Sequence, residues 1–514
     1  MDKSTRYDRQ LRLWAQDGQT RLEKSHVCLV NATSTGSEIL KNLVLPGIGS
    51  FTIVDSRNVE EDDLSGNFFL QQLDLGRNIA QAMSQCLGEL NPEVRGIGIS
   101  QDLESLIQQP DFWANFSAVI VSERVNSLIL LSLKQLLWDK GTPLLVVSTC
   151  GFYGTVHIIN KETTVVETHD PSKLYDLRID CPWPELEKYA DSFVLEDLDD
   201  TEHAHVPYIV IFIKALREWK LRHNGNAPLN YAEKKQFRSE YIEGMSRDIR
   251  LETNFMEASQ SVHRALQVTA VPDSIRKLFD NSIIDDSNLN LNTPPFWLYV
   301  RALKDFVAHK GQLPLPGNLP DMASKTSNYV NLQNIFRAKC LEDQNIFKML
   351  LLELYRRIGR SESELDDESI STFCKNAAFL FMSHGSPYSY SPALKKELLE
   401  DSNDYSSNAS ILAIHFGILA LYEWMEVRET DSLASYLNFF KTLLSTDELK
   451  LSEKVLNVLK EIFVHQTSNY HNIGSFIGGI AAQEILKITT EQYIPLDNLY
   501  VYDGIRSVSC KWKV

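Results

Sequence analysis

The chain has 514 residues, of which 43% are hydrophobic, and its 51 basic and 68 acidic residues give a formal net charge of −17. This length predicts more than one domain, since typical domains have about 100–200 residues. An acidic balance excludes the basic face that a nucleic-acid-binding protein needs, and it disfavours docking to anionic membranes. We therefore expect a globular protein without nucleic-acid or membrane partners.

The cysteines and the N-terminus indicate a reducing compartment. Seven cysteines are scattered along the chain without any CxxC pair, which is typical neither of a disulfide framework nor of a zinc site. The N-terminal residues are charged and contain no apolar leader. The most apolar stretch, residues 410–425, is too short for a membrane span and is interrupted by His415 and Glu423. We expect a cytoplasmic and nuclear protein.

Strand and helix patterns alternate in the first part of the chain. Residues 26–30 form a β-branched apolar run, and residues 37–45 have helical spacing and end at Pro46-Gly47. With a strand at 50–55 they make a βαβ unit. Further strands are expected at 118–122, 144–149 and 154–159, with helices near 76–90 and 124–138. The fold class is α/β, with a Rossmann-like, mostly parallel sheet covered by helices on both faces.

The pattern changes near residue 163 and becomes helical and charged as far as residue 463. Acidic runs at 196–202 and 361–369 and a Pro-rich run at 313–320 interrupt it, and we interpret them as solvated loops. An apolar helix at 475–488 and strands at 499–505 and 507–514 then close the chain. The predicted domains are 1–162 with 464–514, split by a helical insertion at 163–463.

The first strand-to-helix turn lacks most of the glycines that a nucleotide site needs. It reads Asn31-Ala32-Thr33-Ser34-Thr35-Gly36, so side chains at 31 and 33 would crowd a phosphate. Asp55 lies about 20 residues beyond Gly36, where an acidic residue would hold a ribose. An Asp at a strand end is common in such folds, and it is the only support for an NAD-dependent oxidoreductase. The turn disfavours nucleotide binding by this chain alone.

Several blocks of sequence resemble the ubiquitin-activating-enzyme superfamily, and within it the regulatory subunits of the activating enzyme for the ubiquitin-like modifier of cullins. They are YDRQLRLW at 7–14, the turn and flanking strands at 31–55, IGGIAAQEILKI at 477–488, and blocks at 168–180, 292–308 and 328–340. Blocks at both ends and inside the insertion make this resemblance more specific than a lone βαβ unit. It implies an adenylation-type fold that is catalytically inactive.

The resemblance implies losses at several nucleotide-binding positions, although Gly36 and Asp55 remain. Arg57 stands where active members carry a second Asp, Gly66 replaces a phosphate-gripping Arg, Ile79 replaces a Lys, and Asn126 replaces an Asp used near magnesium. With the cations gone, a triphosphate would be unbalanced. ATP and Mg²⁺ are therefore expected in a partner chain, with no cofactor, metal or catalytic residue in this one.

The resemblance also assigns the insertion to the domain that carries the catalytic cysteine in active members. Cys181 and Cys340 lie in it, but neither has the surroundings expected of that nucleophile, and Cys150 follows a buried strand. No basic residue is placed beside any of the cysteines in a way that predicts a reactive thiolate. We predict an insertion without a catalytic cysteine.

Arg9 and two partner-binding patches follow from the same resemblance. In active dimers an Arg of the N-terminal helix reaches the nucleotide of the other half, and Arg9 in YDRQ matches it; otherwise it is a solvated charge. The family uses the stretches matching 47–64 and 328–339 for its partner, although the apolar residues in them could equally be core. The partner-binding candidates are Gly47, Ile48, Phe51, Asp55, Leu64, Tyr329, Leu332, Ile335, Phe336 and Arg337.

The expected function is that of a regulatory subunit in a heterodimeric activating enzyme. The partner chain would adenylate the modifier and form a thioester with it, and a conjugating enzyme would bind transiently. The regulatory subunit of the sumoylation enzyme is an alternative, although it has a much shorter insertion. A self-sufficient adenylating homodimer and a non-enzymatic signalling adaptor are the others; ATP turnover by the isolated chain and co-purification with a catalytic partner distinguish them.

Overall fold

The computed structural model describes residues 3–169, 175–385, 394, 397–398, 408–444, 451–466 and 468–514, with the side chains of residues 3 and 4 left out. The chain forms two compact units. One comprises Met1–Val165 with Phe381–Val514, and the other Val166–Leu380. We call them the sheet unit and the helical unit, and each is described by itself.

The sheet unit is built on an eight-stranded sheet with the order β10-β9-β6-β5-β4-β1-β2-β3. The five strands from β3 to β5 are parallel, and β6, β9 and β10 are antiparallel to their neighbours. The strand order therefore reverses between β1 and β4. The strands are β1 (His26–Val30), β2 (Ser50–Val54), β3 (Arg95–Ile99), β4 (Ala118–Ser122), β5 (Leu144–Cys150), β6 (Tyr153–Ile159), β9 (Leu499–Asp503) and β10 (Val508–Trp512).

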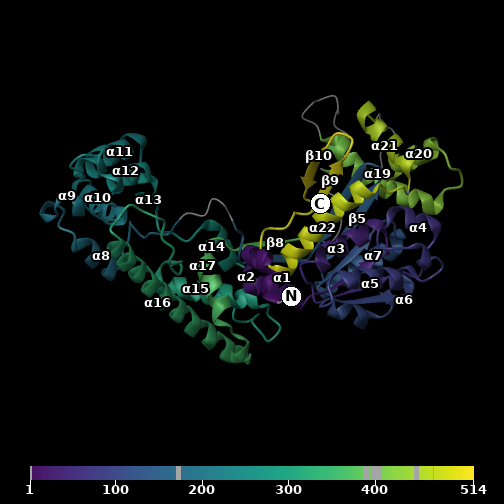
Figure 1. The fold of residues 1–514 in the computed structure, drawn as a ribbon, viewed down its shortest axis with the longest axis horizontal. Coiled ribbons are helices and arrows are strands. Elements are labelled where there is room, and N and C mark those ends of the chain that lie inside the picture. The colour runs from purple at the N-terminus through teal and green to yellow at the C-terminus, as the bar shows by residue number, and fades with distance from the viewer. Residues whose placement is uncertain are drawn as a thin grey trace. The chain divides into compact units, whose positions relative to one another are not determined.

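Helices cover both faces of the parallel strands, as the apolar runs predict. Alternate residues of β1 point to opposite faces: Leu29 packs with Ile39 and Ile477, whereas Val30 packs with Leu133 on the other side. Figure 1 shows α3 and α22 alongside each other, with α5, α6 and α7 around the strands. These helices, with those at the N-terminus, are α1 (Lys3–Arg6), α2 (Asp8–Glu23), α3 (Ser34–Val44), α4 (Glu61–Gly66), α5 (Ile79–Leu90), α6 (Leu103–Ile107), α7 (Ser127–Lys140) and α22 (His471–Thr490).

The edge strand β3 was missing from the sequence prediction. Its sequence, RGIGI, contains two glycines, which weaken a strand pattern. Both are needed for close packing. A Cβ on Gly96 would lie 2.5 Å from the Phe51 ring, and one on Gly98 would lie 2.5 Å from the carbonyl oxygen of Ala80 in α5.

Residues 381–463 belong to the sheet unit, whereas the sequence analysis placed them in the insertion. Helices α19 (Ala409–Val427), α20 (Leu433–Leu443) and α21 (Glu453–His465) share a core with Tyr153 of β6 and Val501 of β9. Helix α19 is apolar on nearly every side because it lies in this core. Its length and hydropathy would allow a membrane crossing, but 67% of its apolar window is buried in the protein.

The chain leaves and re-enters the sheet unit through a two-stranded antiparallel sheet of β7 (Glu162–Val165) and β8 (Phe381–His384). Between them lies the helical unit, whose core gathers Phe212, Trp219, Phe255 and Phe336. Its α-helices are α8 (Pro184–Asp191), α9 (Asp200–His203), α10 (Tyr208–Arg222), α11 (Tyr231–Gln236), α12 (Thr253–Gln260), α13 (Val262–Ala265), α14 (Asp273–Phe279), α15 (Pro295–Lys310), α16 (Thr326–Ile358) and α17 (Asp367–Asn376).

Candidate functional site

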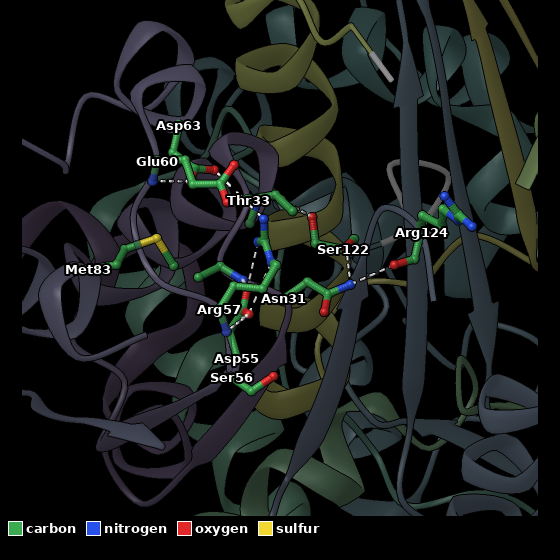
Figure 2. Close-up of polar contacts among 12 residues, drawn as sticks. Asn31, Thr33, Asp55, Ser56, Arg57, Glu60, Asp63, Met83, Ser122 and Arg124 are labelled. Carbon is green, nitrogen blue, oxygen red and sulfur yellow. Dashed lines mark hydrogen bonds and ion pairs between the residues drawn. The ribbon is translucent and has the colours of Figure 1, made fainter. Parts of the chain in front are cut away.

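The candidate site is the carboxyl end of the sheet between β1 and β4. In open α/β sheets ligands bind in a crevice at the point where the strand order reverses. Here Asn31 follows β1 with φ 68°, and its side chain crosses this point. Its Nδ2 donates to the carbonyl oxygens of Ser122 at 3.1 Å and Arg124 at 2.9 Å, at the end of β4 (Figure 2). The asparagine amide thus bridges the two strands that would flank a nucleotide.

Thr33 makes a second contact across the same crevice. Its Oγ1 lies 2.6 Å from Ser122 Oγ, again joining the turn to β4. The same Oγ1 accepts a hydrogen bond of 3.0 Å from the backbone N–H of Gly36, which makes Thr33 the N-cap of α3. In a nucleotide site that N–H faces phosphate. An internal side chain therefore satisfies a donor that a ligand would use.

Asp55, the expected ribose contact, is saturated by the protein itself. Its carboxylate is 5% exposed. It accepts hydrogen bonds from the backbone N–H of Ala32 at 2.9 Å and of Arg57 at 3.0 Å. The Arg57 guanidinium adds bonds of 3.2 Å and 2.7 Å to its two oxygens (Figure 2). A ribose hydroxyl finds no free acceptor on this carboxylate.

The remaining nucleotide positions have structural roles. Ile79 is fully buried at the start of α5. Gly66 ends α4, and only the side chain of Ser34 lies within 4 Å of the place where its Cβ would be. Asn126 is the N-cap of α7, and its Nδ2 donates to Glu426 of α19 at 2.9 Å. Among the described residues, no three His, Cys, Asp or Glu are grouped to hold a metal ion.

Glu123 is a feature of the site that sequence reasoning missed. It follows β4 with φ 65° and is 8% exposed. Its carboxyl accepts bonds from Thr149 N at 2.9 Å, Thr149 Oγ1 at 2.8 Å and the Tyr422 hydroxyl at 3.1 Å. Burial raises the pKa of Glu123 above its usual range, although these hydrogen bonds oppose the shift. Thr149 in turn lies 3.2 Å from Thr35 in the first turn of α3, so this network fills the phosphate side of the crevice.

Burial raises the pKa of all seven cysteine thiols, that of Cys150 to about 12. The nucleophile in thioester formation is a thiolate, and catalytic cysteines have lowered pKa values. Cys181 is the exposed one of the seven, and burial also dominates its shift. These thiols are poorly suited to accept a modifier.

Comparison with known proteins identifies the family of this chain. The model of the ThiF family matches residues 7–511. The chain belongs to the ThiF family. It is 36% identical to the NEDD8-activating enzyme E1 regulatory subunit of Gallus gallus, over 100% of this chain and 98% of that protein. It is 33% identical to the subunit AXR1 of Arabidopsis thaliana (98% and 95% covered) and 29% identical to that of Saccharomyces cerevisiae (99% and 100%).

These relatives place the chain among the NEDD8-activating enzyme E1 regulatory subunits of the ThiF family. Their shared name favours the neddylation branch over the sumoylation alternative. The match runs through the helical insertion, which is the part that distinguished the two branches in the sequence. The Rossmann-like, mostly parallel fold expected from the resemblance agrees with the eight-stranded sheet and with the match to this family.

Arg9 lies exposed near the start of α2 in this ThiF-family chain. Its guanidinium makes no hydrogen bond or ion pair with another described residue. The nearby arginines differ: Arg12 on the same helix pairs with Asp8 at 2.8 Å, and Nη1 of Arg6, at the end of α1, donates to Asn91 at 2.7 Å. The start of the helix is anchored by Tyr7, which is 3% exposed. Arg9 is thus a free cation on an anchored helix.

Four of the predicted partner-binding candidates are core residues, which is the alternative that the sequence left open. Ile48 is 1% exposed, and Phe51, Leu332 and Phe336 are fully buried. They present no surface to a partner. Gly47 is also buried and packs against Tyr7.

Asp55 is buried as well, whereas the four remaining candidates keep some exposure and two exposed apolar residues lie outside the predicted patches. Leu64, Tyr329 and Ile335 are half-buried and Arg337 is exposed. Just beyond Leu64, the side chains of Phe68 and Leu73 are 76% and 87% exposed. Sequence could not identify them, because hydrophobicity alone does not distinguish a core phenylalanine from an exposed one.

Proposed function

We propose that this chain is the non-catalytic subunit of a heterodimeric NEDD8-activating enzyme. Its partner chain binds ATP and Mg²⁺. There the carboxylate at the modifier's C-terminus attacks the α-phosphate and pyrophosphate leaves; a partner thiol then attacks the acyl adenylate and AMP leaves. The thioester passes to a conjugating enzyme that binds transiently. The observation that carries this proposal is the bridge from Asn31 to Ser122 and Arg124 across the crevice.

The filled crevice supports a partner-bound nucleotide on energetic grounds. ATP would have to displace the Asn31 amide and free the Asp55 carboxylate from Ala32 and Arg57. Leaving a buried donor or acceptor unsatisfied costs about 1–3 kcal/mol each. The chain has no glycine-rich turn and no lysine at position 79, so contacts with ATP would not offset this cost. The internal hydrogen bonds are therefore favoured over ATP binding.

Arg9 supports a role beyond scaffolding. Phosphate charge in transition states is commonly stabilised by an arginine supplied from another chain. Arg9 meets two requirements of such a residue, because it is exposed and has no competing carboxylate among the described residues. We assign it to the nucleotide in the partner's site, where it would balance charge on the phosphates.

Phe68 and Leu73 support a stable partner contact. Large exposed apolar side chains are frequent anchors of protein interfaces. They lie four and nine residues beyond Leu64, just outside the first partner patch. The Phe68 ring also packs edge-on against His471 with centroids 4.1 Å apart, so it is held in place before a partner binds. An obligate interface buries about 2,000–5,000 Å², and these residues would lie within it.

The free cysteines support a reducing compartment for this chain. Seven free cysteines without a disulfide suit the reducing cytoplasm and nucleus. We propose that the heterodimer acts there.

Mixing the chain with candidate catalytic subunits tests the function. The chain is combined with the catalytic subunit of the NEDD8 enzyme or of the sumoylation enzyme, plus ATP, Mg²⁺ and fluorescent modifiers. Non-reducing gels then score thioesters. We expect a NEDD8 thioester that needs both this chain and its catalytic partner. A thioester that forms equally well without this chain, or only with the sumoylation pair, would refute the proposal.

A further inference from the structure

The helical unit contains a cleft that none of the functions above uses. It has a volume of about 470 Å³ and lies between the segments 175–178, 267–272 and 313–318 and the end of α17. Ligand pockets are commonly about 300–1,000 Å³. All its described lining residues belong to the helical unit.

Arg178 lines this cleft with a guanidinium that is only partly engaged. Its side chain is 1% exposed. Nε and Nη2 donate to the Asp176 carboxylate at 3.1–3.2 Å, and Nη2 also donates to the carbonyl oxygen of Leu313 at 2.6 Å. Nη1 donates to no described residue, although a guanidinium has five N–H donors. The residue also holds φ 52°, a strained conformation that often marks a binding site.

A second pair fixes the opposite wall. Asp180 accepts bonds from Thr269 N at 2.8 Å and from Thr269 Oγ1 at 2.6 Å. The backbone N–H groups of Val268 and Ala270, on either side of Thr269, donate to no described residue. Both residues line the cleft. Arg178, Val268 and Ala270 thus line the cleft and each carries an N–H donor without a partner among the described residues.

The rest of the lining is largely apolar. Val268 is 71% exposed at the cleft, and Tyr175 is 37% exposed. Pro272 and Pro314 complete this surface. The Arg264 guanidinium lies 5.4 Å from the centre of the Tyr175 ring and adds a cation nearby, while Arg178 neutralises Asp176. A ligand that matches these walls presents an acceptor to Nη1 of Arg178 and has an apolar group next to it.

We infer that this cleft binds an extended peptide bearing a carboxylate beside an apolar side chain. The carboxylate meets Arg178, peptide carbonyl oxygens accept from the free N–H groups of Val268 and Ala270, and the apolar side chain packs on Val268 and the prolines. Backbone pairing with side-chain pockets is an established mode of peptide recognition. The carboxylate is either a chain terminus or an Asp or Glu side chain. This site does not depend on the proposed function of the sheet unit.

The test uses the full chain and a library of fluorescein-labelled pentapeptides. The last two positions of these peptides are varied over the apolar amino acids. One set ends in a free carboxylate, a second in an amide, and a third in an amide with an added Glu. Fluorescence anisotropy measures binding. We expect the first or third set to bind at least about tenfold more tightly than the second, because the amide set cannot form the charge-assisted hydrogen bond to Arg178. The set that binds tells a terminus from a side chain.

Two matched variants localise the binding. Val268→Asp places a like charge at the cleft, whereas Leu251→Asp changes a side chain that is 78% exposed and does not line it. Both positions are exposed, so both variants should fold. Val268→Asp should weaken peptide binding about tenfold or more and Leu251→Asp less than about twofold. Equal binding of acid and amide peptides, no binding below about 1 mM, or equal effects of the two variants would overturn the inference.

Discussion

Arg57 Nη2 lies 2.7 Å from Asp55 Oδ2, so an arginine two positions along the chain occupies the carboxylate that would hold a ribose in this fold. Arg57 stands where the resemblance implies a second acidic residue, and its guanidinium neutralises the carboxylate of Asp55. Together with the Asn31 bridge, this makes the closed crevice a property of the folded chain.

The isolated chain should not bind ATP. The donors and acceptors of the crevice are used by Asn31, Thr33 and Asp55, and no cation stands at positions 66 or 79. Isothermal titration calorimetry with ATP and Mg²⁺ should show no site tighter than about 1 mM, which corresponds to about 4 kcal/mol. A micromolar site on the purified chain would show that ATP readily displaces these internal hydrogen bonds, and it would contradict the closed crevice.

Gly47→Ala should destabilise the sheet unit. Gly47 has φ 90°, and an added Cβ would lie 2.6 Å from the Tyr7 hydroxyl oxygen and 2.8 Å from its ring carbon. We expect a loss of about 1–3 kcal/mol in the free energy of unfolding. Gly479→Ala is the control, because its Cβ meets nothing within 4 Å inside α22; it should be neutral or slightly stabilising. Equal unfolding midpoints in urea would show that Tyr7 is not held against Gly47.

The sequence predicted the parallel strands and the broken turn because both depend on local patterns. Val27–Val30 is a short apolar run with a β-branched valine at each end, which favours a strand buried on both faces. The loss of glycines at 31 and 33 is visible in the letters alone. The consequence at Asp55 was not visible, since it required knowing that Arg57 turns back onto the strand end.

Other features depend on long-range packing and escaped prediction. In the sequence Glu123 resembles any charged residue that follows a strand. In the structure Thr149 and Tyr422, from distant segments, donate hydrogen bonds to its carboxyl group. Helix α19 is clearly buried from its composition, but its composition does not say that it packs on β6 and β9. Likewise, Phe51 and Phe68 are equally hydrophobic, and only the fold shows which one is exposed.

Replacing Phe68 and Leu73 with Asp should weaken association with the catalytic subunit while leaving the helix content unchanged. Both side chains are largely exposed, so the free chain loses little packing, whereas an interface would have to bury two charges. Analytical ultracentrifugation measures association, and circular dichroism measures helix content. Phe336→Asp is the contrasting variant: this residue is fully buried, and its substitution should cost about 3–5 kcal/mol of stability. Unchanged association in the Phe68/Leu73 variant would exclude this surface.

The sheet unit should lose stability in acid through two buried histidines. His157 of β6 and His415 of α19 lie with ring centres 5.9 Å apart, close to Lys134 and Glu423. Burial, and then the charge of Lys134, lower the pKa of His415 to about 3, and burial lowers that of His157. As the pH falls, these histidines bind protons in the unfolded chain before they do so in the folded one. The free energy of unfolding is therefore unaffected above pH 6.5 and decreases as the pH drops from 6.5 toward the folded-state pKa. The decrease is up to about 1.4 kcal/mol per pH unit for each proton.

Urea unfolding between pH 8 and pH 5 checks this dependence. His415→Gln should flatten the fall in midpoint below pH 6.5, because one of the two buried titrating groups is gone. His309→Gln changes an exposed histidine at the end of α15 and should leave the slope unchanged. Identical slopes in the wild type and His415→Gln would assign the acid sensitivity to other groups.

Arg9→Ala should slow modifier adenylation by the assembled heterodimer without affecting assembly. The Arg9 side chain is exposed and makes no contact that stabilises the fold, but its charge would meet phosphate in the partner's site. Arginine fingers in phosphoryl transfer contribute about 10³–10⁵ in rate, and we expect less for attack at the α-phosphate, about 10–100-fold. Arg12→Ala is the control, since Arg12 already pairs with Asp8, and it should have a smaller effect. Equal rates for Arg9→Ala and wild type would leave Arg9 as a surface charge.

ATP–pyrophosphate exchange tests the central claim most directly, because it reports adenylation separately from thioester formation. It is measured with NEDD8 for this chain alone, for the catalytic subunit alone and for the two together. The account predicts no exchange by this chain, little by the catalytic subunit and rapid exchange by the pair. Exchange by this chain alone, or a rate for the pair no higher than that of the catalytic subunit, would contradict it.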